Sequence, residues 1–333
     1  MESKRIESRL GRFSYLLKGG AKPRRSFALM MALVLVGMLS LAGVVSADSV
    51  WNGETLKTTN GISGTVTGGV DAKFANTWKT DNPINNDNTT ATFSALQTER
   101  IQFARLYVVA YTANMTANWQ GTETITLTRP GVGDVVLANA QPLNLDYDQT
   151  AGWTCADGLS APFVTTGTGL CRVTSDYVSV FDVKDYMNST SMTLYINTTN
   201  VSDRFDGRIK EAKLVYGWNS PEIKYWINEG HDPSTSADDA YVGETTFAVA
   251  TTTGITNVTL YTDDIASANG IYGWNGAAGT LAPTTIGSNS YARLNQYAVG
   301  SGSVLSGTNV FRYDRDPTKS WYKLAVAILK ITY

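Results

Sequence analysis

The sequence contains few residues that could perform acid–base or nucleophilic catalysis. Its only histidine, His231, lies in a Gly-His-Asp-Pro segment next to Asp232. A catalytic histidine needs a reacting group within hydrogen-bond reach, but the chain has no Gly-x-Ser-x-Gly motif that would present a serine nucleophile. We therefore expect His231 to be a structural residue in a turn.

Pairs of aspartates are a second source of chemistry. Two carboxyl groups on either side of a glycosidic bond can hydrolyse it as acid and base. Because every pair in this chain lies in polar sequence of the kind that forms turns, we expect no enzyme activity. The pairs are Asp203/Asp206, Asp238/Asp239, Asp263/Asp264 and Asp314/Asp316.

Acidic loops can also bind Ca²⁺, which takes several oxygen ligands. The chain lacks the spaced Asp-x-Asp-x-Asp-Gly pattern of a dedicated calcium loop. We therefore expect no cofactor, and the alternative is that the protein binds Ca²⁺. The residues that would form it are Asp203, Asp206, Asp238 and Asp239.

Most of the chain after residue 48 is predicted to form β-strands. It is rich in Thr, Val and Tyr, which favour strands, and Gly-containing turn dipeptides such as Asn60-Gly61 separate the apolar runs. No stretch shows the apolar period of a helix, and we interpret Val183–Met187 as a turn. Clear strands are predicted at Phe103–Tyr111, Thr122–Thr128, Tyr177–Val183, Met192–Asn197, Lys213–Trp218, Asn257–Thr262 and Leu324–Tyr333.

Residues 1–47 have the organisation of an export signal. A basic segment precedes an apolar helix-length run from Phe27 to Val45, and small residues end the run before Asp48. The run is long enough to span a bilayer, so an uncleaved signal anchor is the alternative to a cleaved signal peptide. Either interpretation predicts that residues 48–333 are secreted, with membrane contact only through this segment.

Two further patterns agree with an extracellular location. Cys155 and Cys171 predict a disulfide in an oxidising compartment, and two free buried thiols are the alternative. Asn-x-Ser/Thr sequons predict glycans on the surface. They begin at Asn88, Asn114, Asn188, Asn197, Asn200 and Asn257.

An internal repeat predicts the domain organisation. Thr92-Phe93, Ile101 and Leu106-Tyr107 recur at one constant offset as Thr246-Phe247, Ile255 and Leu260-Tyr261. Tyr177, Ala212 and Leu214 match Tyr291, Ala327 and Leu329 at a shorter offset, so the first copy carries an insertion that contains both cysteines.

We therefore predict two tandem antiparallel β-sandwich modules of jelly-roll type. A leading segment at residues 48–63 precedes the first module at residues 64–220, which holds the disulfide-closed insertion. The second module is predicted at residues 221–333.

Several segments resemble a family of uncharacterised secreted proteins of methanogenic archaea built from tandem β units. The most specific is Tyr225–Asp232 (YWINEGHD), and the resemblance extends over residues 64–333. It implies an archaeal cell-envelope or sheath-type surface protein and brings no established catalytic residues. The other matching segments are Ala104–Tyr107, Asp176-Tyr177, Phe205–Ile209, Tyr241–Gly243, Thr246-Phe247 and Gly270–Tyr272.

The expected function is that of a structural envelope protein that pairs with copies of itself through sheet edges. Phe103–Tyr111 and Leu324–Tyr333 are the predicted edges. The alternative is a secreted module that binds envelope glycans or other carbohydrates through some of the eight tryptophans and 17 tyrosines. Because the chain is acidic outside its basic leader, we expect no nucleic-acid partner.

Overall fold

The computed structural model describes residues 47–51, 55–58, 63–77, 86–112, 119–145, 175–203, 205–235, 242–266, 268–276, 279–319 and 321–333. In these ranges the regular elements are β-strands, apart from the single-turn 3-10 helices Lys184–Tyr186 and Ser301–Ser303. All pairings between the strands are antiparallel. The all-β prediction is therefore confirmed.

The predicted export signal lies outside the described residues, except for Ala47. Within the described ranges no helix is long and apolar enough to span a bilayer.

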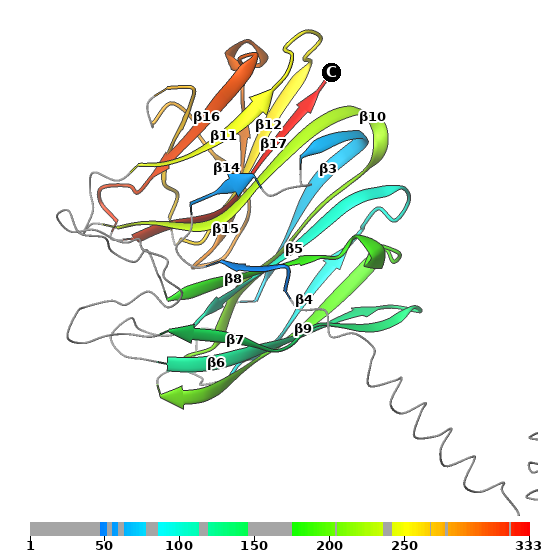
Figure 1. Ribbon diagram of the computed structural model, residues 1–333, viewed down its shortest axis with the longest axis vertical. Helices are drawn as coiled ribbons and strands as arrows, with labels where there is room; N and C mark the ends of the chain where they lie inside the picture. Colours follow the sequence, from blue (N-terminus) through cyan, green and yellow to red (C-terminus); the bar gives the residue numbers. More distant parts are fainter. Residues whose placement is uncertain are drawn as a thin grey trace, which may run out of the picture. The chain divides into compact units, whose positions relative to one another are not determined.

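The described strands form one central sheet and two outer sheets (Figure 1). The central strands are β1 (Ser49–Trp51), β2 (Lys57–Thr58), β3 (Gly64–Asn76), β5 (Ile101–Tyr111), β8 (Asp176–Asp182), β10 (Arg208–Thr235), β12 (Asn257–Asp264), β14 (Thr284–Ser288), β15 (Arg293–Ala298) and β17 (Trp321–Thr332). Their order is β1-β8-β5-β10-β17-β12-β15-β14, and β2 and β3 also pair with β10.

The first outer sheet has the order β4-β9-β6-β7 and the second has the order β11-β16-β13. The outer strands are β4 (Asn88–Ser94), β6 (Trp119–Arg129), β7 (Gly133–Leu145), β9 (Ser191–Asp203), β11 (Gly243–Val249), β13 (Ile271–Trp274) and β16 (Gly307–Asp314).

Strand β10 joins the two halves of the central sheet. Its residues 208–218 pair with β5, and its residues 223–235 pair with β17. Between these two parts, the pairing of β10 with β3 shifts register between Asn219 and Glu222. Pro221 lies at this shift. Proline has no N–H to donate to a neighbouring strand and is therefore tolerated at such irregular positions. Figure 1 shows β10 curving back over at one end. As a result, Phe103 of β5 stacks on Tyr225 from the second half of β10, with ring centroids 4.3 Å apart.

Three apolar clusters fill the spaces between the layers. The first packs β4, β6, β7 and β9 against β5, β8 and the first half of β10. The third packs β11, β13 and β16 against β12, β15 and β17. The second cluster lies between the two halves of the central sheet. The fold therefore consists of two β-sandwich modules, as predicted, packed face to face.

The residues that define the sequence repeat occupy matching places in the two sandwiches. Phe93, Leu106 and Leu214 belong to the first cluster, and their counterparts Phe247, Leu260 and Leu329 belong to the third. The strand orders also match, because β4-β9-β6 corresponds to β11-β16-β13 and β8-β5-β10 corresponds to β15-β12-β17. The proposed boundary at residues 220 and 221 falls inside β10, so the sandwiches share a strand.

Two predictions about sheet edges were wrong. Phe103–Tyr111 and Leu324–Tyr333 are not sheet edges, because β5 lies between β8 and β10 and β17 lies between β10 and β12. Their continuous apolar sequence reflects burial of both faces rather than an exposed pairing edge. The predicted turn at Val183–Met187 contains the 3-10 helix Lys184–Tyr186.

Candidate functional site

Asp176 of β8 is the centre of a group of buried charges between the two sandwiches. Its Oδ1 lies 2.8 Å from Nζ of Lys210, and its Oδ2 contacts Nζ of Lys323. All three side chains are buried. Because Asp176 and Lys210 belong to the first sandwich and Lys323 belongs to the second, the shared carboxylate ties the two modules together.

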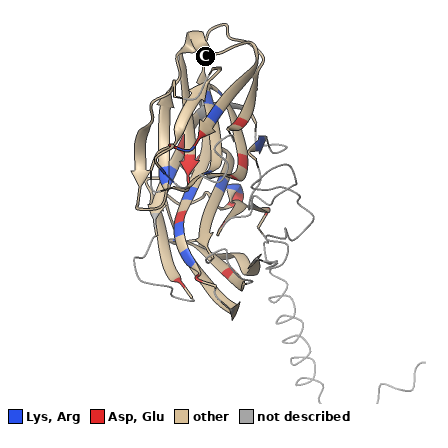
Figure 2. Ribbon diagram, turned by 90° about the vertical axis from the view of Figure 1, so that its left-hand side faces the viewer, with Lys and Arg blue, Asp and Glu red and all other residues tan. Residues whose placement is uncertain are grey.

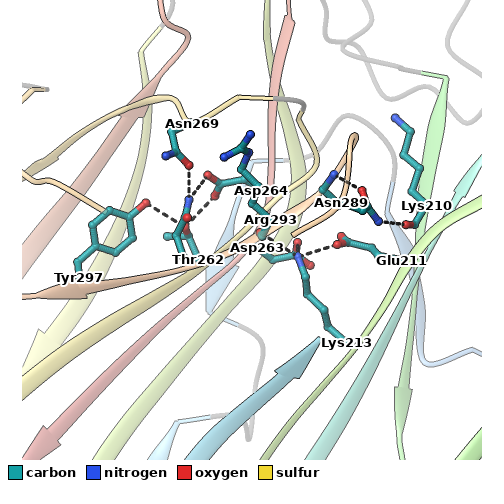
Figure 3. Close-up of polar contacts among 12 residues, drawn as sticks. Lys210, Glu211, Lys213, Thr262, Asp263, Asp264, Asn269, Asn289, Arg293 and Tyr297 are labelled. Atoms are coloured by element: carbon teal, nitrogen blue, oxygen red, sulfur yellow. Dashed lines mark hydrogen bonds and ion pairs between the residues drawn. The ribbon is translucent and has the colours of Figure 1, made fainter. Parts of the chain in front are cut away.

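Lys213 extends this group toward β12 (Figure 3). Its Nζ lies 2.9 Å from Oε2 of Glu211, contacts Oδ1 of Asp263 and donates a hydrogen bond to the carbonyl oxygen of Arg293 at 3.1 Å. The ring of Phe74 covers the amine, with its centroid 5.4 Å from Nζ. We call the whole set the inter-sheet cluster. It consists of Asp176, Lys210, Glu211, Lys213, His231, Asp263 and Lys323.

His231 is a member of this cluster and is fully buried in β10. It lies next to the register shift between Glu229 and Asp232. The prediction of a turn was wrong, because the strand continues through the Gly-His-Asp-Pro segment. Burial, reinforced by the charge of Lys323, lowers the pKa of His231 to about 3, so the imidazole is neutral at neutral pH.

Burial and neighbouring charges set the protonation of the other members. Burial alone would raise the pKa of Asp176, but Lys210 and Lys323 outweigh it and hold the pKa well below its usual value. Burial lowers the pKa of Lys323 to about 8. Burial also lowers the pKa of Lys213 and raises the pKa of Glu211. The two ends of the cluster therefore differ, since ionised groups are favoured at Asp176 and neutral groups at Glu211 and Lys213.

A second polar tie between the sandwiches is formed by Arg105 of β5 and Glu229 of β10. Arg105 donates from Nε and Nη2 to the two oxygens of Glu229, each at 3.1 Å, and from Nη1 to Asp48 at 2.8 Å. The hydroxyl of Tyr107 donates to Glu229 Oε1 at 2.6 Å. Such bidentate, charge-assisted bonds fix geometry as well as add energy. Figure 2 shows how acidic and basic residues follow one another along the strands in the middle of the molecule.

Asp263 and Asp264 were predicted to lie in a turn, and this was wrong. Both are buried in β12 and point to opposite faces of the central sheet. Asp264 lies inside the second sandwich, where it accepts hydrogen bonds of 2.7 Å from Thr262 and Asn295 and contacts the hydroxyl of Tyr272. Burial raises the pKa of Asp264 to about 6. The two carboxyl groups therefore have different partners, since Asp263 contacts Lys213.

Of the calcium candidates, only the Asp206 side chain can be described. It accepts hydrogen bonds from Nε and Nη2 of Arg208 at 2.6 and 2.7 Å, so its charge is already paired. Asp203 ends β9, and Asp238 and Asp239 lie outside the described residues. Among the residues that the structure describes, no three His, Cys, Asp or Glu side chains are grouped as metal ligands.

The predicted modification sites are only partly within the described ranges. Asn88, Asn188, Asn197 and Asn257 are exposed, and Asn200 is half-buried. Asn114, Cys155 and Cys171 lie outside the described residues. Asn88 of β4 and Asn197 of β9 are cross-strand neighbours on the first outer sheet.

Sequence reasoning missed the inter-sheet cluster, although a signal was present. Lys323, like Arg105 in the second tie, interrupts an otherwise apolar strand, whereas Lys213 follows the charged residues Lys210 and Glu211. Lys and Arg are almost never fully buried without a partner. A lone cation inside an apolar strand therefore predicts a buried carboxylate from another strand. The cluster can hold the two halves of the central sheet together and can move protons between neighbouring groups.

Comparisons with solved structures give only loose similarity. PNGase F, a glycosylasparaginase from Flavobacterium meningosepticum, is 12% identical over 79% of this chain and 96% of that chain, with a TM-score of 0.25. A beta-porphyranase of glycoside hydrolase family 86 from Bacteroides plebeius is 11% identical over 84% of this chain and 38% of that chain, with a TM-score of 0.24. At these scores neither structure carries an argument about activity.

Sequence comparison identifies the family of the chain but gives no activity. No curated protein matches the chain. The family described as "Protein of unknown function (DUF3344)" matches residues 51–332, and the chain therefore belongs to this family.

Proposed function

We propose that this protein is a secreted structural component of the cell envelope, similar to sheath or surface-layer proteins of methanogenic archaea. In this function it has no reaction to catalyse. Copies of the chain associate through sheet edges into an extracellular polymer, and the buried ion pairs keep the two sandwiches of each copy rigid.

The observation that carries this proposal is the first outer sheet. Among the described residues, β4 and β7 each pair with a strand on one side only. β4 (NTTATFS) has no charged residue and alternates regularly between exposed and buried positions. An uncharged edge strand with regular alternation is a template on which another strand can pair. β7 also exposes the apolar side chain of Val136, and Val132 is exposed in the turn before it.

The two edges differ, which determines the kind of assembly. If β4 of one copy adds to β7 of the next, the contact is head-to-tail rather than two-fold symmetric. Head-to-tail contacts that do not close into a ring produce open filaments. An edge-to-edge polymer is therefore the expected product.

A pair of matched lysine substitutions tests this proposal. Thr92 of β4 and Thr193 of β9 are cross-strand neighbours whose hydroxyls lie 3.1 Å apart. Thr92→Lys and Thr193→Lys lose the same hydroxyl contact and add the same charge to the same face, but only Thr92 lies on an edge strand. Light scattering should show polymerisation of the wild-type chain as its concentration rises.

We expect Thr92→Lys to raise the concentration needed for polymerisation by about fivefold, which corresponds to about 1 kcal/mol per strand contact. Thr193→Lys should stay close to the wild type. A wild-type chain that remains a monodisperse monomer at high concentration would refute the proposal, and so would equal effects of the two substitutions.

A carbohydrate-binding function is the second candidate, and one observation favours it. Tyr291 and Trp321 are exposed, and their ring centroids lie 5.8 Å from Nζ of Lys210 and Lys323, respectively. Both lysines contact Asp176, so the two aromatic side chains lie at the same end of the inter-sheet cluster. A glycan array that shows saturable binding, lost in Trp321→Ala, would favour this function over the structural one.

A further inference from the structure

We propose that Lys213 and Asp263 are joined by an amide bond between Nζ and Cγ, formed within the folded chain with Glu211 as the proton carrier. This modification is independent of the proposed function. It would convert the Lys213 end of the inter-sheet cluster from an ion pair into a covalent link between β10 and β12.

The geometry brings the three reacting groups together. Nζ of Lys213 contacts a carboxyl oxygen of Asp263 and lies 2.9 Å from Oε2 of Glu211 (Figure 3). The side chains of Lys213, Glu211 and Asp263 are at most 3% exposed. Groups held at contact distance in one orientation react as if at very high concentration.

The remaining oxygen atoms of the two carboxyl groups also fit this reaction. Oε1 of Glu211 and Oδ2 of Asp263 are buried, and neither has a hydrogen-bond partner within the described part of the chain. Unpaired buried carboxylate oxygens are costly. Protonation of these oxygens, or removal of one of them as water, relieves that cost.

Burial also favours the protonation states that the reaction needs. An amine attacks a carbonyl carbon only when it is unprotonated, and burial lowers the pKa of Lys213. A carboxylic acid can donate a proton only when it is neutral, and burial raises the pKa of Glu211. The apolar surroundings, which include the ring of Phe74, disfavour the charged forms of both groups.

The step balances without an oxidant, a reductant or a co-reactant. In the proposed step the lone pair of the Lys213 amine forms the N–C bond to Cγ of Asp263, and the carboxyl group reacts as the carboxylic acid. Glu211 protonates the carboxyl oxygen of Asp263 and accepts a proton from the attacking nitrogen. The C–O bond then breaks, and one amine hydrogen leaves with the hydroxyl group as water. Glu211 ends as it began, and the product is a neutral amide.

Lys323 and Asp176 form a similar contact at the other end of the cluster but lack these conditions. Asp176 also lies 2.8 Å from Lys210, and the two lysines hold its pKa well below the usual value. An ionised carboxylate is a poor target for an amine. This pair is therefore expected to remain ionic.

Intact-protein mass spectrometry of the full chain tests the proposal directly. After reduction of the cysteines, the wild-type chain should be lighter than its sequence mass by one water molecule, after allowance for any removed leader and attached glycans. Proteolysis should release a branched peptide that contains both Lys213 and Asp263. A succinimide also loses water but gives no branched peptide. Unbranched peptides that contain Lys213 and Asp263 separately would overturn the proposal, and this result needs no variant.

Two glutamate variants test the role of Glu211. Glu211→Gln keeps the shape of the side chain but cannot carry the proton, so the branched peptide should be lost. Glu123→Gln is the matched control, because Glu123 is equally buried but lies inside the first sandwich, next to Ser179. The Glu123→Gln variant should still give the branched peptide that contains Lys213 and Asp263. A branched peptide that persists in Glu211→Gln would show that Glu211 is not the proton carrier.

Discussion

The tie between Arg105 and Glu229 predicts a strongly non-additive response to mutation. Glu229→Met removes the acceptor of two Arg105 hydrogen bonds and leaves a buried guanidinium that is paired only with Asp48. Arg105→Met instead leaves Glu229 buried with the hydroxyl of Tyr107. The double variant removes both charges and replaces them with apolar side chains.

The structure gives the expected magnitude of each change. Removing one partner of a buried ion pair costs about 3–5 kcal/mol, whereas replacing both partners with apolar residues is often nearly neutral. The loss of stability in Glu229→Met should be at the lower end of this range, about 3 kcal/mol, because Asp48 still contacts Nη1 of Arg105. For a chain of this size about 3 kcal/mol corresponds to a fall in melting temperature of about 5 °C.

Thermal and urea unfolding of the three variants measure this coupling. We expect the double variant to recover most of the loss, which gives a coupling energy of about 2 kcal/mol or more in the mutant cycle. If the double variant loses as much stability as the sum of the two single variants, the ion pair does not act as described. Single variants within about 0.5 kcal/mol of the wild type would also refute the reasoning.

Three further predictions concern Glu123, Asp176 and Gly270. Burial raises the pKa of Glu123 from 4.5 to about 7. The contribution of Glu123 to the free energy of unfolding is therefore fully present below about pH 4.5 and is lost as the pH rises through 7. Glu123→Gln should therefore gain about 3 kcal/mol relative to the wild type between pH 4 and pH 8, and a pH-independent difference in melting temperature would contradict this. Asp176→Asn leaves Lys210 and Lys323 facing each other without a carboxylate and should cost about 3–5 kcal/mol in urea unfolding; a loss below about 1 kcal/mol would argue against the cluster. A Cβ on Gly270 would lie 2.4 Å from the backbone oxygen of Asp314, whereas a Cβ on Gly276 would lie no closer than 3.6 Å to its nearest neighbour. Gly270→Ala should therefore destabilise the chain by about 1–3 kcal/mol and Gly276→Ala by much less, and equal losses would show that the backbone near Gly270 can move.

Local patterns in the sequence were sufficient to predict the strands and the two sandwiches. The spacing of Phe93 and Leu106, repeated at Phe247 and Leu260, corresponds to equivalent strands in the two modules. Such patterns succeed because alternation of apolar residues depends only on which face of one strand is buried.

The pairing of distant strands was not predictable in the same way. Leu324–Tyr333 was predicted to be an edge, but a continuous apolar run at the end of the chain does not reveal that two strands flank it. Asp263 and His231 were assigned to turns because such polar residues favour turns. Asp263 is buried in contact with Lys213 of β10, and His231 is buried in β10, whose pairing with β17 brings the charge of Lys323 near it.

The proposal of a structural envelope protein is tested most directly by electron microscopy of native cell envelopes in which this protein is labelled. If the protein is such a component, the label should be distributed continuously over an ordered tube or lattice outside the membrane. Label confined to the culture medium, or scattered over an envelope whose lattice persists without the protein, would contradict it.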